Sequence, residues 1–289
     1  MKQTTPAVVL ALFWILIITI AATSDEGKLG FVACPINENM YLSNEVHGSI
    51  HIWNNSHFIQ QAEAENWDGN GSESTPYLID AYNITSDNIG IQIQDITLYF
   101  VIRDCYLDSV TGIFSPGIFL SNVSHGKICG TTVTGKTVGI DIDFQSQVNI
   151  EGCKVFGCTN AAINVYQSDN CRIDNCELYG GIHGIQTRYT DFLTISNTEV
   201  HASSDIGIYI TESYFVNVTG GSTYDNGGAG IAFSGTHNST ISFHETYNNS
   251  EGRTGVHLLY SDNATIINNK FHDNIYAGLL LRYSHYAHI

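Results

Sequence analysis

From Gly90 to its last residue, the sequence repeats itself at intervals of 22 to 27 residues. A small residue opens each repeat, and these openers are Gly90, Gly117, Gly139, Ala162, Gly184, Gly207, Gly230, Gly255 and Gly278. A β-branched residue stands eleven positions after every opener except the first, and this column comprises Ile128, Ile150, Ile173, Ile195, Val218, Ile241, Ile266 and Ile289. Such self-similarity at a nearly fixed period is typical of a solenoid built from stacked coils.

The residues inside one repeat predict strands. Each opener precedes an apolar, variable, apolar triplet such as Ile140-Asp141-Ile142, which has the two-residue period of a strand. A second short strand surrounds the isoleucine column, and an apolar residue five positions later, such as Leu178, marks a third. The leucine scaffold of leucine-rich repeats is missing. We therefore predict an all-β fold, a right-handed single-stranded parallel β-helix of about eight to nine coils of about 23 residues.

The repeat divides the chain into three segments. Residues 1–24 contain an apolar run at 7–22, whose length and polar flank favour a cleaved signal peptide over an N-terminal anchor. Residues 25–89 should form an N-terminal cap with a short helix, capped by Ser56, that buries Phe58 and Ala62. Residues 90–289 form the coils. The sequence stops inside the coil that contains Ile289, so we expect further coils or a cap beyond it.

The charge of the chain limits its partners. It carries 11 Lys and Arg against 28 Asp and Glu, a net charge of −17. This charge would repel nucleic acids, and it leaves calcium open as a cofactor. A membrane is expected as a partner only through an uncleaved leader.

Glycosylation sequons indicate a secreted or cell-surface glycoprotein. The eight acceptor residues are Asn54, Asn70, Asn83, Asn122, Asn217, Asn238, Asn248 and Asn263.

The seven cysteines show neither a secreted disulfide framework nor a zinc-type pair, so no metal site is predicted from them. Cys153 and Cys176 occupy the same position in adjacent coils. Stacked strands lie about 4.8 Å apart with parallel side chains, an arrangement that suits buried free thiols better than a disulfide.

Three stretches resemble one known group of proteins. They are Asn66 to Ser72 (NWDGNGS), Pro76 to Ile79 (PYLI) and Tyr99 to Cys105 (YFVIRDC), followed by the Gly-Ile-x-Ile coils. This part of the chain resembles the NosD-like, pectate-lyase-type right-handed β-helix proteins, often described as carbohydrate-binding and sugar-hydrolase domains. The resemblance implies the same fold and a sugar ligand. It does not supply catalytic residues, because no signature of a characterised lyase or hydrolase can be matched position by position.

The candidate site therefore comes from coil geometry. Side chains two, four and five positions after each opener should point to solvent on the first sheet and form columns along the solenoid. Aromatic rings, carboxylates and a guanidinium on one flat face suit a sugar chain. The predicted carbohydrate-binding residues are Asp141, Asp143, Tyr166, Arg188, Tyr189, Tyr209, Glu212, His257 and Tyr260.

A catalytic version of this site is a separate hypothesis. Asp141 and Asp143 should lie on one side of a strand, about 6 to 7 Å apart. Carboxylates at such a separation could act as acid and base in inverting hydrolysis. With a divalent cation and Arg188, expected about 10 Å away, they could instead support a uronate lyase. The alternative is that both carboxylates only keep an exposed strand soluble.

Three function classes remain open. Non-catalytic polysaccharide or glycan binding, or a surface scaffold, agrees best with a clear fold that lacks a catalytic signature. A polysaccharide hydrolase or lyase is the alternative, with Asp141, Asp143 and Arg188 or, more weakly, with Glu212 beside Tyr209 and His257. Metal delivery or adhesion to protein is the third class. Histidines of the C-terminal third favour metal slightly, namely His237, His244, His257, His272, His285 and His288.

Overall fold

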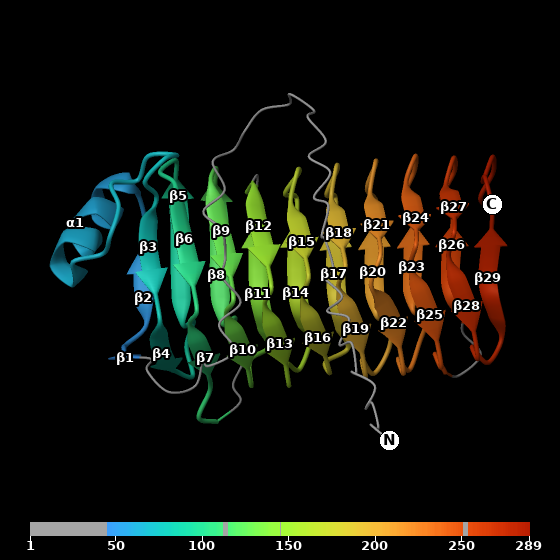
Figure 1. Cartoon of the computed structure of the whole chain (residues 1–289), viewed down its shortest axis with the longest axis horizontal. Coiled ribbons are helices and arrows are strands. Elements are labelled where there is room, and N and C mark those ends of the chain that lie inside the picture. The colour runs from blue at the N-terminus through green and yellow to red at the C-terminus, as the bar shows by residue number, and fades with distance from the viewer. Residues whose placement is uncertain (1–44, 112–114, 145, 251–253) are drawn as a thin grey trace, which may run out of the picture. The chain divides into compact units, whose positions relative to one another are not determined.

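The computed structural model describes residues 45–111, 115–144, 146–250 and 254–289, which form a parallel β-helix. Each strand pairs in parallel with the equivalent strand of the next coil, so three sheets run along the solenoid (Figure 1). The predicted all-β parallel solenoid is therefore confirmed.

The three sheets correspond to the three strands expected in each repeat. The first sheet contains β2 (Ile50–Ile52), β5 (Ile91–Ile96), β8 (Ile118–Val123), β11 (Val138–Asp143), β14 (Ala161–Tyr166), β17 (His183–Arg188), β20 (Ile208–Thr211), β23 (Ile231–Ser234), β26 (Thr254–Leu259) and β29 (Ala277–Arg282). The second sheet contains β3 (Tyr77–Asp80), β6 (Phe100–Arg103), β9 (Gly126–Cys129), β12 (Val148–Glu151), β15 (Arg172–Asp174), β18 (Thr194–Ser196), β21 (Asn217–Thr219), β24 (Thr240–Ser242) and β27 (Thr265–Ile267). The third sheet contains β1 (Glu45–Val46), β4 (Tyr82–Thr85), β7 (Tyr106–Asp108), β10 (Thr132–Thr134), β13 (Lys154–Phe156), β16 (Glu177–Tyr179), β19 (Glu199–His201), β22 (Ser222–Tyr224), β25 (Glu245–Tyr247) and β28 (Lys270–His272).

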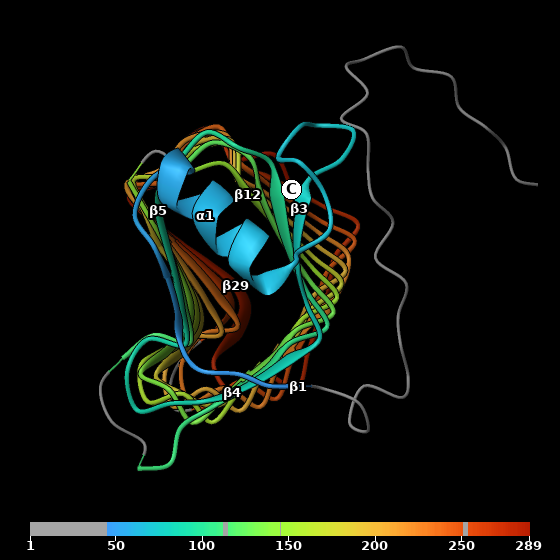
Figure 2. The same ribbon diagram turned by 90° about the vertical axis from the view of Figure 1, so that its left-hand side faces the viewer.

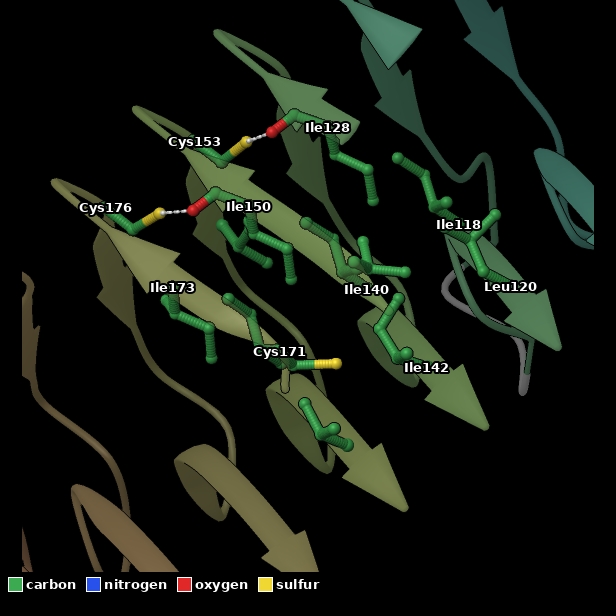
Figure 3. Close-up of a cluster of buried hydrophobic side chains, with 14 of the residues drawn as sticks. Ile118, Leu120, Ile128, Ile140, Ile142, Ile150, Cys153, Cys171, Ile173 and Cys176 are labelled. Carbon is green, nitrogen blue, oxygen red and sulfur yellow. Dashed lines mark hydrogen bonds between the residues drawn. The ribbon is translucent and has the colours of Figure 1, made fainter. Parts of the chain in front are cut away.

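The repeat pattern reflects a core that every coil fills in the same way. Ile140 of β11, Ile150 of β12 and Val155 of β13 are buried in one coil. Equivalent residues of successive coils stack on one another, as Ile128, Ile150 and Ile173 do in Figure 3. The opener must be small because the third strand passes close to it. A Cβ atom on Gly139 would lie 2.1 Å from the Val155 side chain and 2.6 Å from the Ala162 carbonyl oxygen.

Left-handed residues make the corners between the strands. Two residues after the isoleucine column, the backbone has positive φ at Asp104, Gly130, Gly152, Asn175, Asn197, Gly220 and Asn268, as their residue types indicate. Phe243 has the same position and a positive φ, although its residue type does not indicate it. A second left-handed column follows the first strand, at Asp95, Asn122, Phe144, Gln167, Tyr189, Glu212, Gly235, Tyr260 and Tyr283. These residues point outward beside the first sheet, and several of them are large.

The N-terminal helix α1 (Asn55–Glu65) covers the first coil (Figure 2). Phe58 and Ala62 are its buried residues, as predicted. The predicted cap residue is wrong. The Asn54 side chain, rather than Ser56, accepts the hydrogen bond from the backbone N–H of His57, because the helix begins two residues earlier than predicted. The strands also begin before the repeat does, since β1 to β4 lie in the segment that we expected to be a cap.

Cys105, Cys153, Cys158, Cys171 and Cys176 are buried free thiols. The predicted thiols of Cys153 and Cys176 donate to the carbonyls of Ile128 and Ile150, respectively (Figure 3). A hydrogen bond with Cys153 and burial raise the pKa of Cys176. These two residues thus belong to the wall of the core. Cys129 differs, because it is disulfide-bonded.

Within the described ranges, no helix is long and apolar enough to cross a membrane. The predicted leader at residues 1–24 lies outside the described residues.

Candidate functional site

The pairing register places the predicted residues in two outward rows on the first sheet. One row runs Asp141, Asn164, Gln186, Tyr209 across β11, β14, β17 and β20. The neighbouring row runs Asp143, Tyr166, Arg188, Thr211 across the same strands. Because the strands are in register, side chains of successive coils are direct neighbours. The rows combine carboxylate, amide, ring and guanidinium groups.

Asp141 and Asp143 are carboxylates with raised pKa values. Burial raises the pKa of Asp141, although its Oδ1 accepts a hydrogen bond of 2.7 Å from Nδ2 of Asn164. Burial and the nearby charge of Asp141 raise the pKa of Asp143 to about 6. In the ion pairs formed by the described residues, neither carboxylate takes part. Asp143 can therefore hold a proton close to neutral pH.

Arg188 does not join this carboxylate pair. Tyr166 lies between Asp143 and Arg188 in the row, so the two residues are two strands apart, as expected. The Arg188 guanidinium instead donates to the Tyr189 hydroxyl at 2.8 Å, and its Cζ lies 4.6 Å from the centre of the Tyr189 ring. Arg188 therefore does not contact Asp141 or Asp143, as the proposed lyase site would require.

The predicted tyrosines are not equally available to a ligand. Tyr189 is 41% exposed, whereas Tyr166 is half-buried. The Tyr166 ring meets those of Phe144 and Tyr189 edge-on, with ring centres 5.7 and 6.2 Å away. Tyr209 is also half-buried, packing against His183 and a small satellite core. Tyr189 thus offers a sugar the most ring surface of these three.

The remaining predicted residues lie farther along. Glu212 is exposed at the left-handed corner after β20. His257 is in the row of Tyr209 but two strands away, so the weaker cluster with Glu212 is not compact. Tyr260 is exposed and stacks on Tyr283 with ring centres 4.9 Å apart. Residues 257 and 260 therefore form a separate region of the same face.

The structure adds aromatic residues that the sequence analysis did not single out. Phe192, Tyr214 and Phe215 lie exposed at the corner between the first and second sheets, beside the two rows. Aligning the coils on this corner as well as on the openers would have revealed them, because Phe192 and Phe215 occupy one column.

The described residues also bear on metal binding and glycan attachment. In the described part of the chain, no group of three or more His, Cys, Asp or Glu residues is arranged to hold a metal ion. All eight sequon asparagines lie at the surface. Six are exposed, and Asn83 and Asn217 are partly exposed on strands.

Comparison with known proteins supports the fold. Residues 161–289 match the family model described as a right-handed β-helix region. This match covers less than half of the chain, and together with the three parallel sheets it supports the right-handed parallel β-helix fold. No curated protein sequence matches it.

Several solved structures share this fold. Full-length tailspike protein 2 of the Escherichia coli O157:H7 bacteriophage CAB120 aligns with a TM-score of 0.58 and 12% identity over 78% of this chain. The alignment spans only 34% of the tailspike. A mutant of the periplasmic alginate epimerase AlgG aligns with a TM-score of 0.51 and 13% identity over 83% of this chain and 68% of the epimerase. Identities this low establish the fold alone.

Proposed function

We propose that the protein binds a polysaccharide across the outward face of its first sheet, between β11 and β20. The two rows of polar and aromatic side chains carry this proposal. Hydroxyls of a sugar chain would bond to Asp141, Asn164 and Gln186, while its apolar ring faces would pack on Tyr189. The fold shared with a periplasmic alginate epimerase, whose name refers to a polysaccharide, adds support.

The spacing of the coils suits a polymer. Successive strands lie about 4.8 Å apart, which is close to the length of one sugar unit, so a chain along the axis meets one coil per unit. Each contact adds about 1 kcal/mol. Binding should therefore strengthen with chain length and be weak for monosaccharides.

Cleavage at this face is the second candidate function. The observation that favours it is the raised pKa of Asp143, about 6, beside a second carboxylate. A carboxyl group protonated near neutral pH can donate a proton to a glycosidic oxygen, and Asp141 would then activate water as the base. Arg188, engaged with Tyr189, has no direct role in this scheme.

A glycan outside the cell is the partner that this function requires. We propose that the protein is secreted or displayed at the cell surface. The apolar run at residues 7–22 and the surface position of all eight sequon asparagines support this location.

The experiment is affinity electrophoresis of the purified chain in gels that contain neutral or acidic polysaccharides, with and without calcium. The variant Arg188→Ala/Tyr189→Asn, called the face variant below, removes two exposed groups and keeps a residue that tolerates the left-handed corner. We expect retardation by at least one polysaccharide and loss of it in the face variant. Arg172→Ala, on the outward side of the second sheet, is the control and should bind normally. Absence of retardation by every polysaccharide would refute the proposal.

Cleavage is tested in parallel by the release of new reducing ends or unsaturated products. If the protein cleaves the polysaccharide, Asp143→Asn should abolish the release of these products, and its affinity for the polysaccharide should fall less than tenfold. A protein that binds and releases nothing is a binding module.

A further inference from the structure

From Asn170 onward, the corner between the first and second sheets contains a second left-handed position, at Asn170, Phe192, Phe215, Asn238, Asn263 and Tyr286. Backbone hydrogen bonds from Asn170, Phe192, Phe215 and Asn238 to the next coil show that these residues form one column. Each has a φ between 53° and 60°. Asparagine therefore occupies this position on both sides of two phenylalanines.

Phenylalanine is a poor choice for this position on structural grounds. The left-handed region suits Asn and Gly, and it is strained for bulky side chains. Burial does not compensate, because Phe192 is 53% exposed and Phe215 is 49% exposed. Strain and exposure alone do not single out these residues, because Phe243 shares both. What distinguishes Phe192 and Phe215 is that they occupy consecutive coils and stack on each other, which indicates a functional surface.

The two rings form one preorganised unit. They are nearly parallel, at 9°, with centres 5.0 Å apart. The exposed Tyr214 lies next to Phe215, with ring centres 6.4 Å apart. The backbone N–H of Tyr214 donates to the carboxylate of Asp191 at 2.7 Å, which ties the two coils together at this corner.

Buried hydroxyls hold the same corner from inside. The backbone N–H of Thr190 donates to the Ser213 hydroxyl at 3.0 Å, and that hydroxyl donates to the Thr211 carbonyl at 2.8 Å. The corner is therefore fixed before any ligand arrives, so little conformational entropy is lost on binding.

We infer that Phe192, Tyr214 and Phe215 form an aromatic platform that binds the apolar ring faces of an uncharged polysaccharide. This inference rests on the proposed function, and it extends the binding face around the corner from the first sheet.

The surrounding charge selects an uncharged chain. Asp169 and Asp191 lie in the column of Tyr214, and Glu212 is two residues before Tyr214. By contrast, Arg188 and Arg282 are the Lys or Arg side chains on the described outward face of the first sheet. Arg188 is already engaged with Tyr189. Carboxylates at the platform would repel a polymer of uronic acids. They would equally repel an anionic lipid surface, which disfavours a membrane as the occupant.

The test uses the residue that the neighbouring coils already have. Phe192→Asn/Phe215→Asn, the platform variant, relieves two strained positions, so its thermal stability should be unchanged or higher. All proteins are produced in a host without N-glycosylation, because Phe192→Asn creates a sequon with Thr194. The matched control is Phe243→Asn. Phe243 is 66% exposed and left-handed at the other corner, between Gly220 and Asn268 of the adjacent coils. Parent, platform, control and face variants are compared by affinity electrophoresis in mannan, xylan, β-glucan, alginate and polygalacturonate, and by flotation with phosphatidylcholine vesicles.

We expect the parent and the Phe243 control to bind a neutral polysaccharide, and the platform variant to bind it at least tenfold more weakly. A platform variant that binds like the parent, while the face variant does not, overturns this inference and leaves the proposed function standing. Binding by the parent to alginate or polygalacturonate alone overturns the assignment of an uncharged ligand. Flotation of the parent but not of the platform variant, without polysaccharide binding, assigns the platform to lipid and overturns the inference. Failure of the parent to bind any polysaccharide overturns both proposals.

Discussion

Replacing Asp143 by Asn should stabilise the protein at neutral pH, because the native fold holds this carboxyl group in a place that disfavours its charge. Burial and the charge of Asp141 raise the pKa from 3.8 to about 6. At about 1.4 kcal/mol per unit, the ceiling is about 3 kcal/mol. The side chain is partly exposed, so screening by solvent reduces the expected gain to about 1 kcal/mol.

The pH dependence distinguishes this effect from a change in packing. The folded pKa is above the unfolded one, so the native state favours the proton. The stabilising contribution of the protonated group is present below pH 4 and is lost as the pH rises through 6. Asn cannot ionise, so the variant should gain stability at pH 7.5 and equal the parent at pH 3.5.

Thermal unfolding at the two pH values measures this difference. A gain of about 1 kcal/mol corresponds to a rise in Tm of about 2 to 4 °C. Asp225→Asn, at an exposed left-handed corner, is the control and should change little. An equal gain at both pH values, or none at pH 7.5, would show that the carboxyl group is not held in a disfavoured state.

Three further predictions concern the coils themselves. Asn249 is fully buried, and its side-chain amide forms hydrogen bonds with both adjacent coils. Asn249→Ala should therefore lower the free energy of unfolding, measured with denaturant, by about 3 kcal/mol, whereas Asn248→Gly at the exposed neighbour should lower it little. Cys153 and Cys176 should resist alkylation until the fold opens, and a cross-link between them in a non-reduced digest would contradict their assignment as free thiols. Burial lowers the pKa of His244 to about 4. The free energy of unfolding should therefore fall by up to about 3 kcal/mol as the pH decreases from 6.5 to 4, and unfolding curves measured over this pH range should show a smaller fall for His244→Gln.

The fold could be predicted because every coil must satisfy the same interior. Ile150 and Ile173 recur because each packs on the equivalent residue of the next coil, and Gly139 is small because Val155 leaves it no room. The left-handed corner after the isoleucine column was also predictable, because asparagine, as at Asn175, readily adopts the left-handed backbone conformation. Because the same residue types recur in each coil, inward and corner positions can be predicted from the sequence.

The candidate site was less predictable, because outward side chains do not repeat. The rows of Asp143 and Arg188 follow from the register, but the sequence does not show that Arg188 turns to Tyr189. The half-buried position of Tyr209 depends on Ile206 in the preceding corner, whose packing has no period. Contacts among outward side chains are set by ring orientation and not by spacing.

A second aromatic array shows why exposure and backbone strain, rather than ring number, mark the platform. The outward side of the third sheet has a continuous ladder of six rings, Phe156, Tyr179, His201, Tyr224, Tyr247 and His272. Neighbouring ring centres are 4.8 to 5.1 Å apart and the planes differ by at most 14°, so each inner ring has both faces covered by its neighbours. Such a ladder stabilises the stacking of coils, but its four inner rings have no free face for a sugar. Phe192 and Phe215 have the same stacked geometry, but as a pair each covers only one face of the other. All six residues lie on strands, where aromatic side chains are favoured, and their partial burial repays their presence. Phe192 and Phe215 lie at a strained corner rather than on a strand, and they are more exposed than the ladder rings. Ligand binding therefore explains the presence of this pair better than stability does.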